Sequence, residues 1–267
     1  MAKTPLASDS AAQLSIGDSH GTTPEIRTHS IHLSLQGKGG VGKSLIASIL
    51  AQYFRERGRQ IRCIDTDPVN STMFQYKALN VSRLELLRGG IIDHRGFDTL
   101  MERLLTEDAT FVVDNGAATF IPLWNYFLEN HVLDVLAHAG KRLYVHTVVT
   151  GGQALVDTLF GFKSLAESTS ERNIVVWLNE YFGRIEQGGK CFEQMSAFQE
   201  SATKVRGSVH LKKLNQDTFG RDLEDVISRK LTLAEAIKDG PFSIMTKQRL
   251  RMIERDWYEQ LDGLQLI

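Results

Sequence analysis

The 267-residue chain lacks the features that mark secreted, zinc-bound or membrane-spanning proteins. Its two cysteines, Cys63 and Cys191, have the spacing of neither a disulfide framework nor a zinc site, and they suit a reducing compartment. No apolar run approaches the roughly 18 residues that cross a bilayer. A formal net charge of −1 provides no overall attraction to nucleic acid or anionic lipid. We therefore expect a cytoplasmic protein that contacts its partners through local patches.

Residues 1–29 differ in composition from the rest of the chain. They are rich in Ser, Thr, Ala and Gly, contain Pro5 and Pro24, and show no sustained periodicity. They lack the apolar segment of a secretory signal, and Asp9, Asp18 and Glu25 argue against an organelle presequence. We predict a disordered extension over residues 1–29 and a single domain over residues 30–267.

The segment LQGKGGVGKS, residues 35–44, fits the phosphate-binding pattern G-x-x-x-x-G-K-[ST]. In such a loop the glycines let backbone N–H groups face a phosphate, the lysine reaches the β- and γ-oxygens, and the hydroxyl ligates Mg²⁺. Lys43 is therefore the expected phosphate lysine and Ser44 an expected metal ligand. We assign nucleotide binding to Gly37, Lys38, Gly39, Gly40, Val41, Gly42, Lys43 and Ser44.

The residues around this loop have the periodicity that a phosphate site requires. Residues 31–35 alternate as a strand, and apolar residues recur at helical spacing from Ser44 to Phe54, with Gly58 as a C-cap. A helix that begins at the loop directs free N–H groups and the positive end of its dipole at an anion. This arrangement of strand, loop and helix supports the assignment of residues 35–44.

Strand and helix patterns alternate along the chain, which predicts an α/β fold with a mostly parallel twisted sheet and helices on both faces. Besides residues 31–35, the predicted strands are 60–64, 110–113, 143–149 and 174–178. His32 and His146 fall within two of these strands, and we expect them to be structural. Polar or small residues follow each of the last four strands. Because the carboxyl ends of parallel strands line the ligand crevice, we expect these residues to meet at the phosphate loop.

Three aspartates follow two of the predicted strands. Asp114 follows the apolar strand 110–113 and is the candidate Walker B aspartate, because P-loop enzymes hold Mg²⁺ with the loop hydroxyl and an aspartate at a strand end. Asp65 and Asp67 follow strand 60–64 in the sequence Asp-Thr-Asp-Pro. We expect Asp65 to support the metal together with Ser44 and Asp114.

Lys38 and several longer segments indicate a family that this chain resembles. A second lysine directly after the first glycine of the loop marks the deviant loop of the ParA/MinD-type ATPases. More narrowly, segments such as CIDTDPVN, HTVVTGGQAL and VVWLN resemble the TraL family of conjugative-plasmid transfer proteins, in register from about residue 31 to the C-terminus. The resemblance implies ATP and Mg²⁺ as cofactors, slow hydrolysis, an ATP-bound homodimer, and other conjugation proteins as partners.

The resemblance also implies roles for individual residues. Lys38 would cross the dimer interface to the partner's nucleotide, and Asp67, before a proline, would orient the attacking water. The N–H of Gly116 would sense the γ-phosphate. Asn179 would read the nucleobase edge, although asparagine is also an ordinary turn residue. The catalytic set is therefore Lys38, Lys43 and Asp67.

The chain departs from typical ParA proteins at two places that concern hydrolysis. Val69 follows the Asp-Pro pair where glutamine is common, and Asn115 and Gly116 stand where two prolines often follow the Walker B residue. Alternatives to a switched ATPase in conjugation are a plasmid partition or positioning ATPase, a scaffold that binds nucleotide without turnover, and a ligase of the dethiobiotin-synthetase type. Lys38 and the TraL-like segments argue against the ligase.

Two other segments bear on DNA and membrane contact. A helix predicted from Thr246 has an apolar face bordered by basic residues, so it could lie on an anionic membrane or dock on the sheet. Its interspersed acidic residues favour docking. A cluster near the end of the first helix offers a weak, salt-sensitive DNA contact; it consists of Arg55, Arg57, Arg59 and Arg62.

Overall fold

A seven-stranded sheet forms the centre of the computed structural model, which describes residue 1 and residues 29–266. The strand order is β11-β8-β7-β1-β6-β2-β3, and every neighbouring pair is parallel. The strands are β1 (Ser30–Ser34), β2 (Ile61–Asp65), β3 (Ser82–Arg83), β6 (Thr110–Asp114), β7 (Arg142–Thr150), β8 (Ile174–Asn179) and β11 (Val205–Leu211). The predicted α/β class with a mostly parallel sheet is confirmed.

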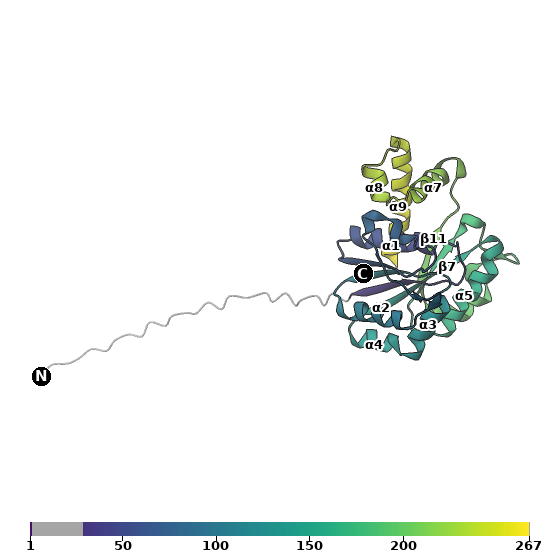
Figure 1. The fold of residues 1–267 in the computed structure, drawn as a ribbon. Helices are drawn as coiled ribbons and strands as arrows, with labels where there is room; N and C mark the ends of the chain where they lie inside the picture. The colour runs from purple at the N-terminus through teal and green to yellow at the C-terminus, as the bar shows by residue number, and fades with distance from the viewer. Residues whose placement is uncertain (2–28, 267) are drawn as a thin grey trace.

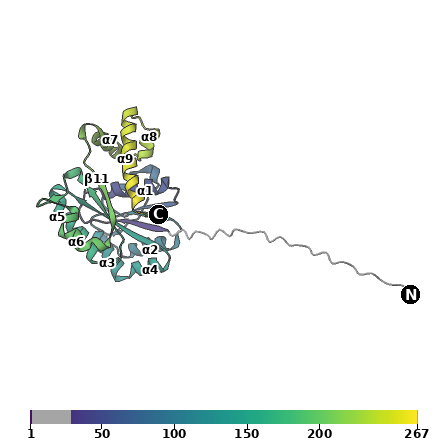
Figure 2. The same cartoon turned by 180° about the vertical axis from the view of Figure 1, so that it is seen from behind.

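Helices cover both faces of this sheet, and each face has its own apolar core (Figure 1). One face packs against α1 (Lys43–Glu56), α7 (Arg221–Ser228), α8 (Leu233–Lys238) and α9 (Ile244–Gly263). The other packs against α2 (Arg95–Thr106), α3 (Phe120–Glu129), α4 (Val132–His138), α5 (Leu155–Glu167) and α6 (Ser196–Ser201). Seen from behind in Figure 2, α7, α8 and α9 rise together above the level of the sheet.

All five predicted strands are present, with ends that differ by at most one residue from the prediction. Two further strands, β3 and β11, escaped prediction because they form the two edges of the sheet and β3 has only two residues. Two hairpins also escaped: β4 (Leu87–Arg88) with β5 (Ile91–Ile92), and β9 (Glu186–Gln187) with β10 (Lys190–Cys191). Both turn at a Gly-Gly pair with positive φ, a signal that was present in the sequence.

Helix α9 docks on the sheet rather than presenting its apolar face to solvent. Four of its apolar residues are at most 5% exposed and share one buried core with those of α1; they are Leu250, Ile253, Trp257 and Leu261. The prediction that this helix docks on the sheet, made from its interspersed acidic residues, is therefore confirmed. Among residues 29–266, no helix combines the length and apolar composition that crossing a bilayer demands. The extension predicted over residues 1–29 lies outside the described residues, apart from Met1 and His29.

A buried chain of hydrogen bonds joins Ser30, His32, His146 and Trp177 across β1, β7 and β8. Trp177 Nε1 donates to His146 Nδ1 over 3.0 Å, so the neutral His146 ring carries its proton on Nε2. His146 Nε2 therefore donates to His32 Nδ1 at 2.9 Å, and His32 Nε2 donates to Ser30 Oγ at 2.9 Å. These four residues are at most 7% exposed. The two histidines are therefore structural and held neutral.

The neutral histidine pair makes stability depend on pH. Burial lowers the pKa of His146 to about 3; burial and the neighbouring His146 lower the pKa of His32, which the rings of Phe54 and Tyr144 flank. The unfolded chain takes up these protons below about pH 6.5 and the native protein does not, so stability falls from there toward about pH 3. Each ring adds about 1.4 kcal/mol per pH unit to this slope of the unfolding free energy. The free energy of unfolding, measured in urea between about pH 6 and 5, falls with pH in wild type. We expect this slope to be about 1.4 kcal/mol per pH unit smaller in His146→Gln.

His131 provides the control for this experiment because its side chain is 81% exposed. We expect His131→Gln to retain the wild-type slope of unfolding free energy against pH. Equal slopes for His146→Gln and wild type would show that the buried pair does not govern acid stability.

Candidate functional site

The phosphate loop connects the carboxyl end of β1 to the first residue of α1. Gly40 and Gly42 have φ values of +75° and +108°, a region that residues with a Cβ rarely adopt. Lys43 and Ser44 are the first two residues of α1, so the free N–H groups of the first helical turn face the loop. The sequence pattern thus corresponds to a folded loop at a helix N-terminus.

Lys43 lies inside the loop and is 8% exposed. Its Nζ donates to the carbonyl oxygen of Lys38 at 3.0 Å, which holds the ammonium at the centre of the loop. Burial lowers the pKa of Lys43, while the charges of Asp114 and Asp67 act in the opposite direction. A desolvated ammonium of this kind gains strongly from contact with an anion.

Asp114 ends β6 and is 1% exposed. Neither of its carboxylate oxygens has a hydrogen-bond partner among the residues that the structure describes. Burial raises its pKa to about 7; Ser44 and Lys43 oppose this increase, whereas Asp65 and Asp67 add to it. A buried carboxylate without a hydrogen-bond partner is unfavourable unless it takes up a proton or binds a cation. Together with the Ser44 hydroxyl it supplies the oxygen ligands that Mg²⁺ prefers, so the residues present fit this ion.

Asp65 and Asp67 both hold the backbone that follows β2. The two oxygens of Asp65 accept hydrogen bonds from the N–H groups of Asp67 and Phe74, at 2.9 Å each. Asp67 Oδ1 accepts from the N–H groups of Val69 and Asn70, at 2.8 and 3.1 Å. Burial is the main cause of a raised pKa at Asp65. In this arrangement Asp65 shapes the loop on which Asp67 lies, and the metal-supporting role of Asp65 stays a prediction.

Asn179 lies at the end of β8 and contacts the phosphate loop directly. Its Nδ2 donates to the carbonyl oxygen of Val41 at 2.9 Å, and its Oδ1 accepts from the N–H of Tyr181 at 3.1 Å. A Cβ on Gly42 would lie 3.1 Å from this Nδ2, so the loop approaches the amide closely. Asn179 therefore braces the loop, and its contact with a base stays a prediction.

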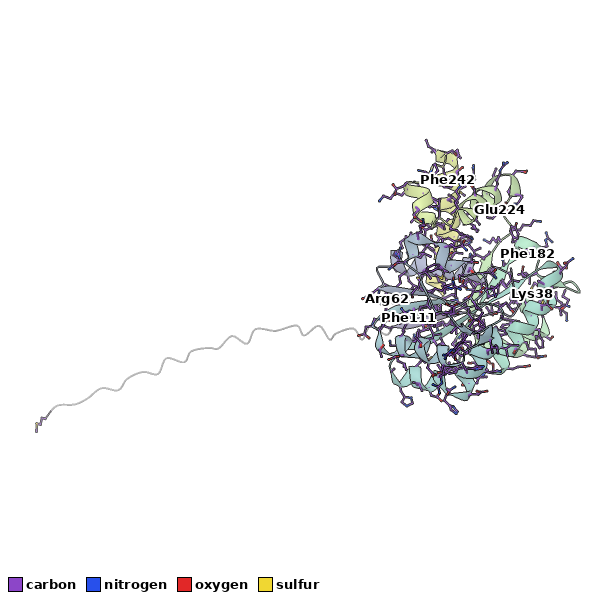
Figure 3. The ribbon with its side chains drawn as sticks, in the orientation of Figure 1. Lys38, Arg62, Phe111, Phe182, Glu224 and Phe242 are labelled. Atoms are coloured by element: carbon purple, nitrogen blue, oxygen red, sulfur yellow. The ribbon has the colours of Figure 1, made fainter. Side chains whose placement is uncertain are left out.

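A pocket of about 350 Å³ opens beside the loop. Gly40 of the loop and Asn179 are among its lining residues, and the walls are largely apolar. Glu224 and Phe182, which also line it, lie on the same side of the molecule as Lys38 in Figure 3. The apolar walls come from Leu45, Leu211, Leu214, Leu223, Ile227 and Trp257. A concave apolar pocket that adjoins a phosphate loop has the form of a nucleotide-base site.

Lys38 extends away from the loop and forms an ion pair with Asp157 of α5. The Nζ–Oδ2 distance is 2.8 Å, and the two side chains are 46% and 55% exposed. Exposed pairs of this kind contribute about 0–1 kcal/mol, so the pair does not hold Lys38 firmly. Asp157 gave no signal in the sequence analysis, since the contact depends on how α5 packs.

Gln36 fixes the start of the loop and was missed in the sequence analysis. Its Oε1 accepts from the N–H of Gly37 at 2.8 Å, and its Nε2 donates to the carbonyls of Val148 and Thr158 at 2.8 and 3.1 Å. A Cβ on Gly161 would clash with Oε1, since the two atoms would be 2.1 Å apart. The sequence shows only a polar residue before the first glycine, and its partners depend on how β7 and α5 pack.

The basic cluster near the end of α1 is largely engaged within the described part of the chain. Arg57, Arg62 and Arg55 bind Asp262 (2.7 Å), Glu107 (3.1 Å) and the carbonyl oxygen of Ala78, respectively. Arg59, which is half-buried, completes the predicted cluster. These contacts reduce the positive charge available to DNA.

The fold and the loop together define a nucleotide-binding protein of the P-loop class. Residues 34–242 match the family described as the CobQ/CobB/MinD/ParA nucleotide binding domain. Two Escherichia coli proteins named TraL are 48% and 46% identical to this chain over 234 residues, which are 87% of this chain and 97% of each relative. The chain therefore belongs to the TraL family within the ParA/MinD superfamily, as the sequence resemblance indicated.

Solved structures support the fold assignment. The MinD cell division protein of Aquifex aeolicus aligns with a TM-score of 0.51 at 18% identity, covering 88% of this chain and 97% of that one. The same organism's MinC:MinD complex contains a chain that aligns with a TM-score of 0.53 at 15% identity, covering 88% and 96%. At these identities the likeness concerns the fold alone.

Proposed function

We propose that this chain is a cytoplasmic ATPase that hydrolyses Mg²⁺-bound ATP slowly in a single domain over residues 30–267. We further propose that it alternates between an ATP-bound homodimer and a released monomer during conjugative DNA transfer. The observation that carries the nucleotide site is the buried Asp114, whose carboxylate has no partner among the described residues and faces the loop of Lys43 and Ser44. Kinship with the TraL proteins supports the place in conjugation.

The phosphates would bind where the N–H groups of the loop and the first turn of α1 converge. Lys43 would exchange the Lys38 carbonyl for phosphate oxygens, a stronger partner for a desolvated ammonium. Ser44 and Asp114 would hold Mg²⁺, with Asp65 beside them. When bound, this ion neutralises charge on the β- and γ-oxygens. The base would enter the pocket at Gly40, where Asn179 fixes the edge of the loop.

The Asp67 carboxylate supports slow hydrolysis. One of its oxygens already accepts two backbone N–H groups, which leaves the other to orient water. The use of Asp67 Oδ1 by the backbone also fits a second candidate, a scaffold that binds ATP without turnover and in which Asp67 only shapes its loop. Phosphate release measured with the purified protein and its Asp67→Ala variant distinguishes the two, because a scaffold shows no turnover in either.

Lys38 supports the homodimer. Its ammonium lies on the exposed side of the loop and is held by a weak surface ion pair, so a nucleotide on a second subunit could displace Asp157. DNA or membrane contact belongs to the alternative partition or positioning role. That alternative has less support, because three arginines of the basic cluster already bind groups within the chain and α9 is docked on the sheet. The similarity to TraL proteins favours the role in transfer.

A mating experiment tests the proposed biological role. The plasmid carries wild type or Lys43→Ala, and immunoblots confirm equal protein levels. We expect the variant to reduce transfer frequency by at least about tenfold, because it removes the contact by which nucleotide drives the switch. Plasmid loss without selection should remain at the wild-type rate. Normal transfer would show that the nucleotide switch is dispensable, whereas increased loss with normal transfer would favour partition.

A further inference from the structure

Asn115 lies between two chain segments that border the phosphate site. Its Oδ1 accepts hydrogen bonds from Thr66 Oγ1 at 3.0 Å and from Thr119 Oγ1 at 2.8 Å. Thr66 separates Asp65 from Asp67, and Thr119 precedes the first residue of α3. The three hydrogen-bonding residues are at most 1% exposed. A single carboxamide oxygen therefore joins segment 65–67 to segment 114–119.

The two segments also touch at Gly116. A Cβ on this glycine would lie 2.8 Å from Asp67 Cγ and 3.1 Å from Asp67 Cα, so any larger residue would displace Asp67. The N–H of Thr66 donates to the carbonyl oxygen of Asp114 at 2.9 Å. The two segments therefore lie in close contact at Gly116 and Asp67, beside the hydrogen bonds of Asn115.

We infer that Asn115 is a positioning residue that couples the backbone of Gly116 to the carboxylate of Asp67. When a γ-phosphate binds at the Gly116 N–H, the effect on the backbone would pass through the Asn115 carbonyl to Thr66, and from Thr66 to its neighbour Asp67. The inference rests on the proposed ATP binding and adds the means by which the two segments respond together.

The network can be removed without leaving a buried hydroxyl unsatisfied. Thr66 Oγ1 has a second acceptor in the carbonyl of Asp114 at 3.1 Å, and Thr119 Oγ1 has one in the carbonyl of Gly116 at 3.1 Å. The variant Asn115→Leu keeps the side-chain size and removes the shared acceptor. Thr66→Val removes one donor, and Thr66→Ser keeps that donor as a matched control.

Hydrogen exchange with ADP or a non-hydrolysable ATP analogue tests the coupling. In wild type the analogue should protect amides of residues 116–119 and of residues 67–74 more than ADP does. In Asn115→Leu and Thr66→Val the protection should persist at 116–119 and decrease markedly at 67–74, because only the Gly116–Asp67 contact and the Thr66 N–H bond still link the segments. Nucleotide affinity should stay within about threefold, turnover should fall by about tenfold, and Thr66→Ser should behave as wild type.

The outcomes separate this inference from the proposed function. Protection at residues 67–74 that is undiminished in Asn115→Leu would overturn the coupling role while leaving ATP binding intact. A wild-type protein that binds neither nucleotide would overturn the proposed function and this inference together. Thermal unfolding of each variant checks that the fold is retained.

Discussion

Replacing Lys43 with alanine should weaken the binding of Mg²⁺–ATP by roughly 30- to 5,000-fold. This range corresponds to the loss of about 2–5 kcal/mol when one partner of a desolvated charge pair is truncated. Lys43 is 8% exposed, so little solvent can reach the phosphate contact that is lost with its ammonium. Titration with a fluorescent ATP analogue in the presence of Mg²⁺ measures the effect.

The fold should survive this substitution. Burial lowers the pKa of Lys43, so the native protein without nucleotide gains little from the charge. Lys163→Ala provides a matched control, because Lys163 is an exposed lysine of α5 paired with Glu200 at 2.9 Å. We expect its nucleotide affinity to equal that of wild type. Unchanged affinity in Lys43→Ala would refute the assignment of the loop.

Replacing Lys38 with alanine should separate nucleotide binding from self-association. We expect ATP affinity within about threefold of wild type, because the Lys38 side chain points away from the loop toward Asp157. The ATP-induced dimer should weaken by at least about 30-fold, since a buried interfacial charge contact is lost. Sedimentation velocity with ATP and with ADP measures both states.

Two further variants make the dimer experiment specific. Asp157→Asn removes the partner of Lys38 within the chain, so its dimer should form at least as readily as that of wild type. Asp67→Ala should bind ATP and keep the dimer for longer, because it removes the group assigned to orient water. A wild-type ATP dimer that persists unchanged in Lys38→Ala would rule out the role across the interface.

Local patterns predicted much of the fold and of the site. The phosphate loop is contiguous in sequence, so its glycines, Lys43 and Ser44 could be assigned before any contact was known. The strands around it were recognisable because buried parallel strands are apolar along their length. Asp114 could be assigned because it directly ends such a strand. Short edge strands such as β3 carry too little periodicity for the same treatment.

Contacts between distant segments were inaccessible to the same reasoning. Asn179 was predicted to contact the nucleobase. The structure shows that its amide also binds the loop at Val41, which is 138 positions away in the sequence. The partners of Gln36 and Lys38 lie in β7 and α5, so they depend on how that strand and helix pack against β1. No pattern within a short window records such a pairing.

The sequence by itself determined the class of site, because a phosphate loop requires specific residues at fixed local spacing. It also determined the α/β architecture, since apolar periodicity is a local property of strands and helices. Only the tertiary structure decided that Asp114 is buried without a partner and that Asn115 joins the segments around Asp67 and Gly116. The physical reason is that burial and hydrogen bonding depend on which segments pack together, and the sheet order brings residues 65–67 beside residues 114–119.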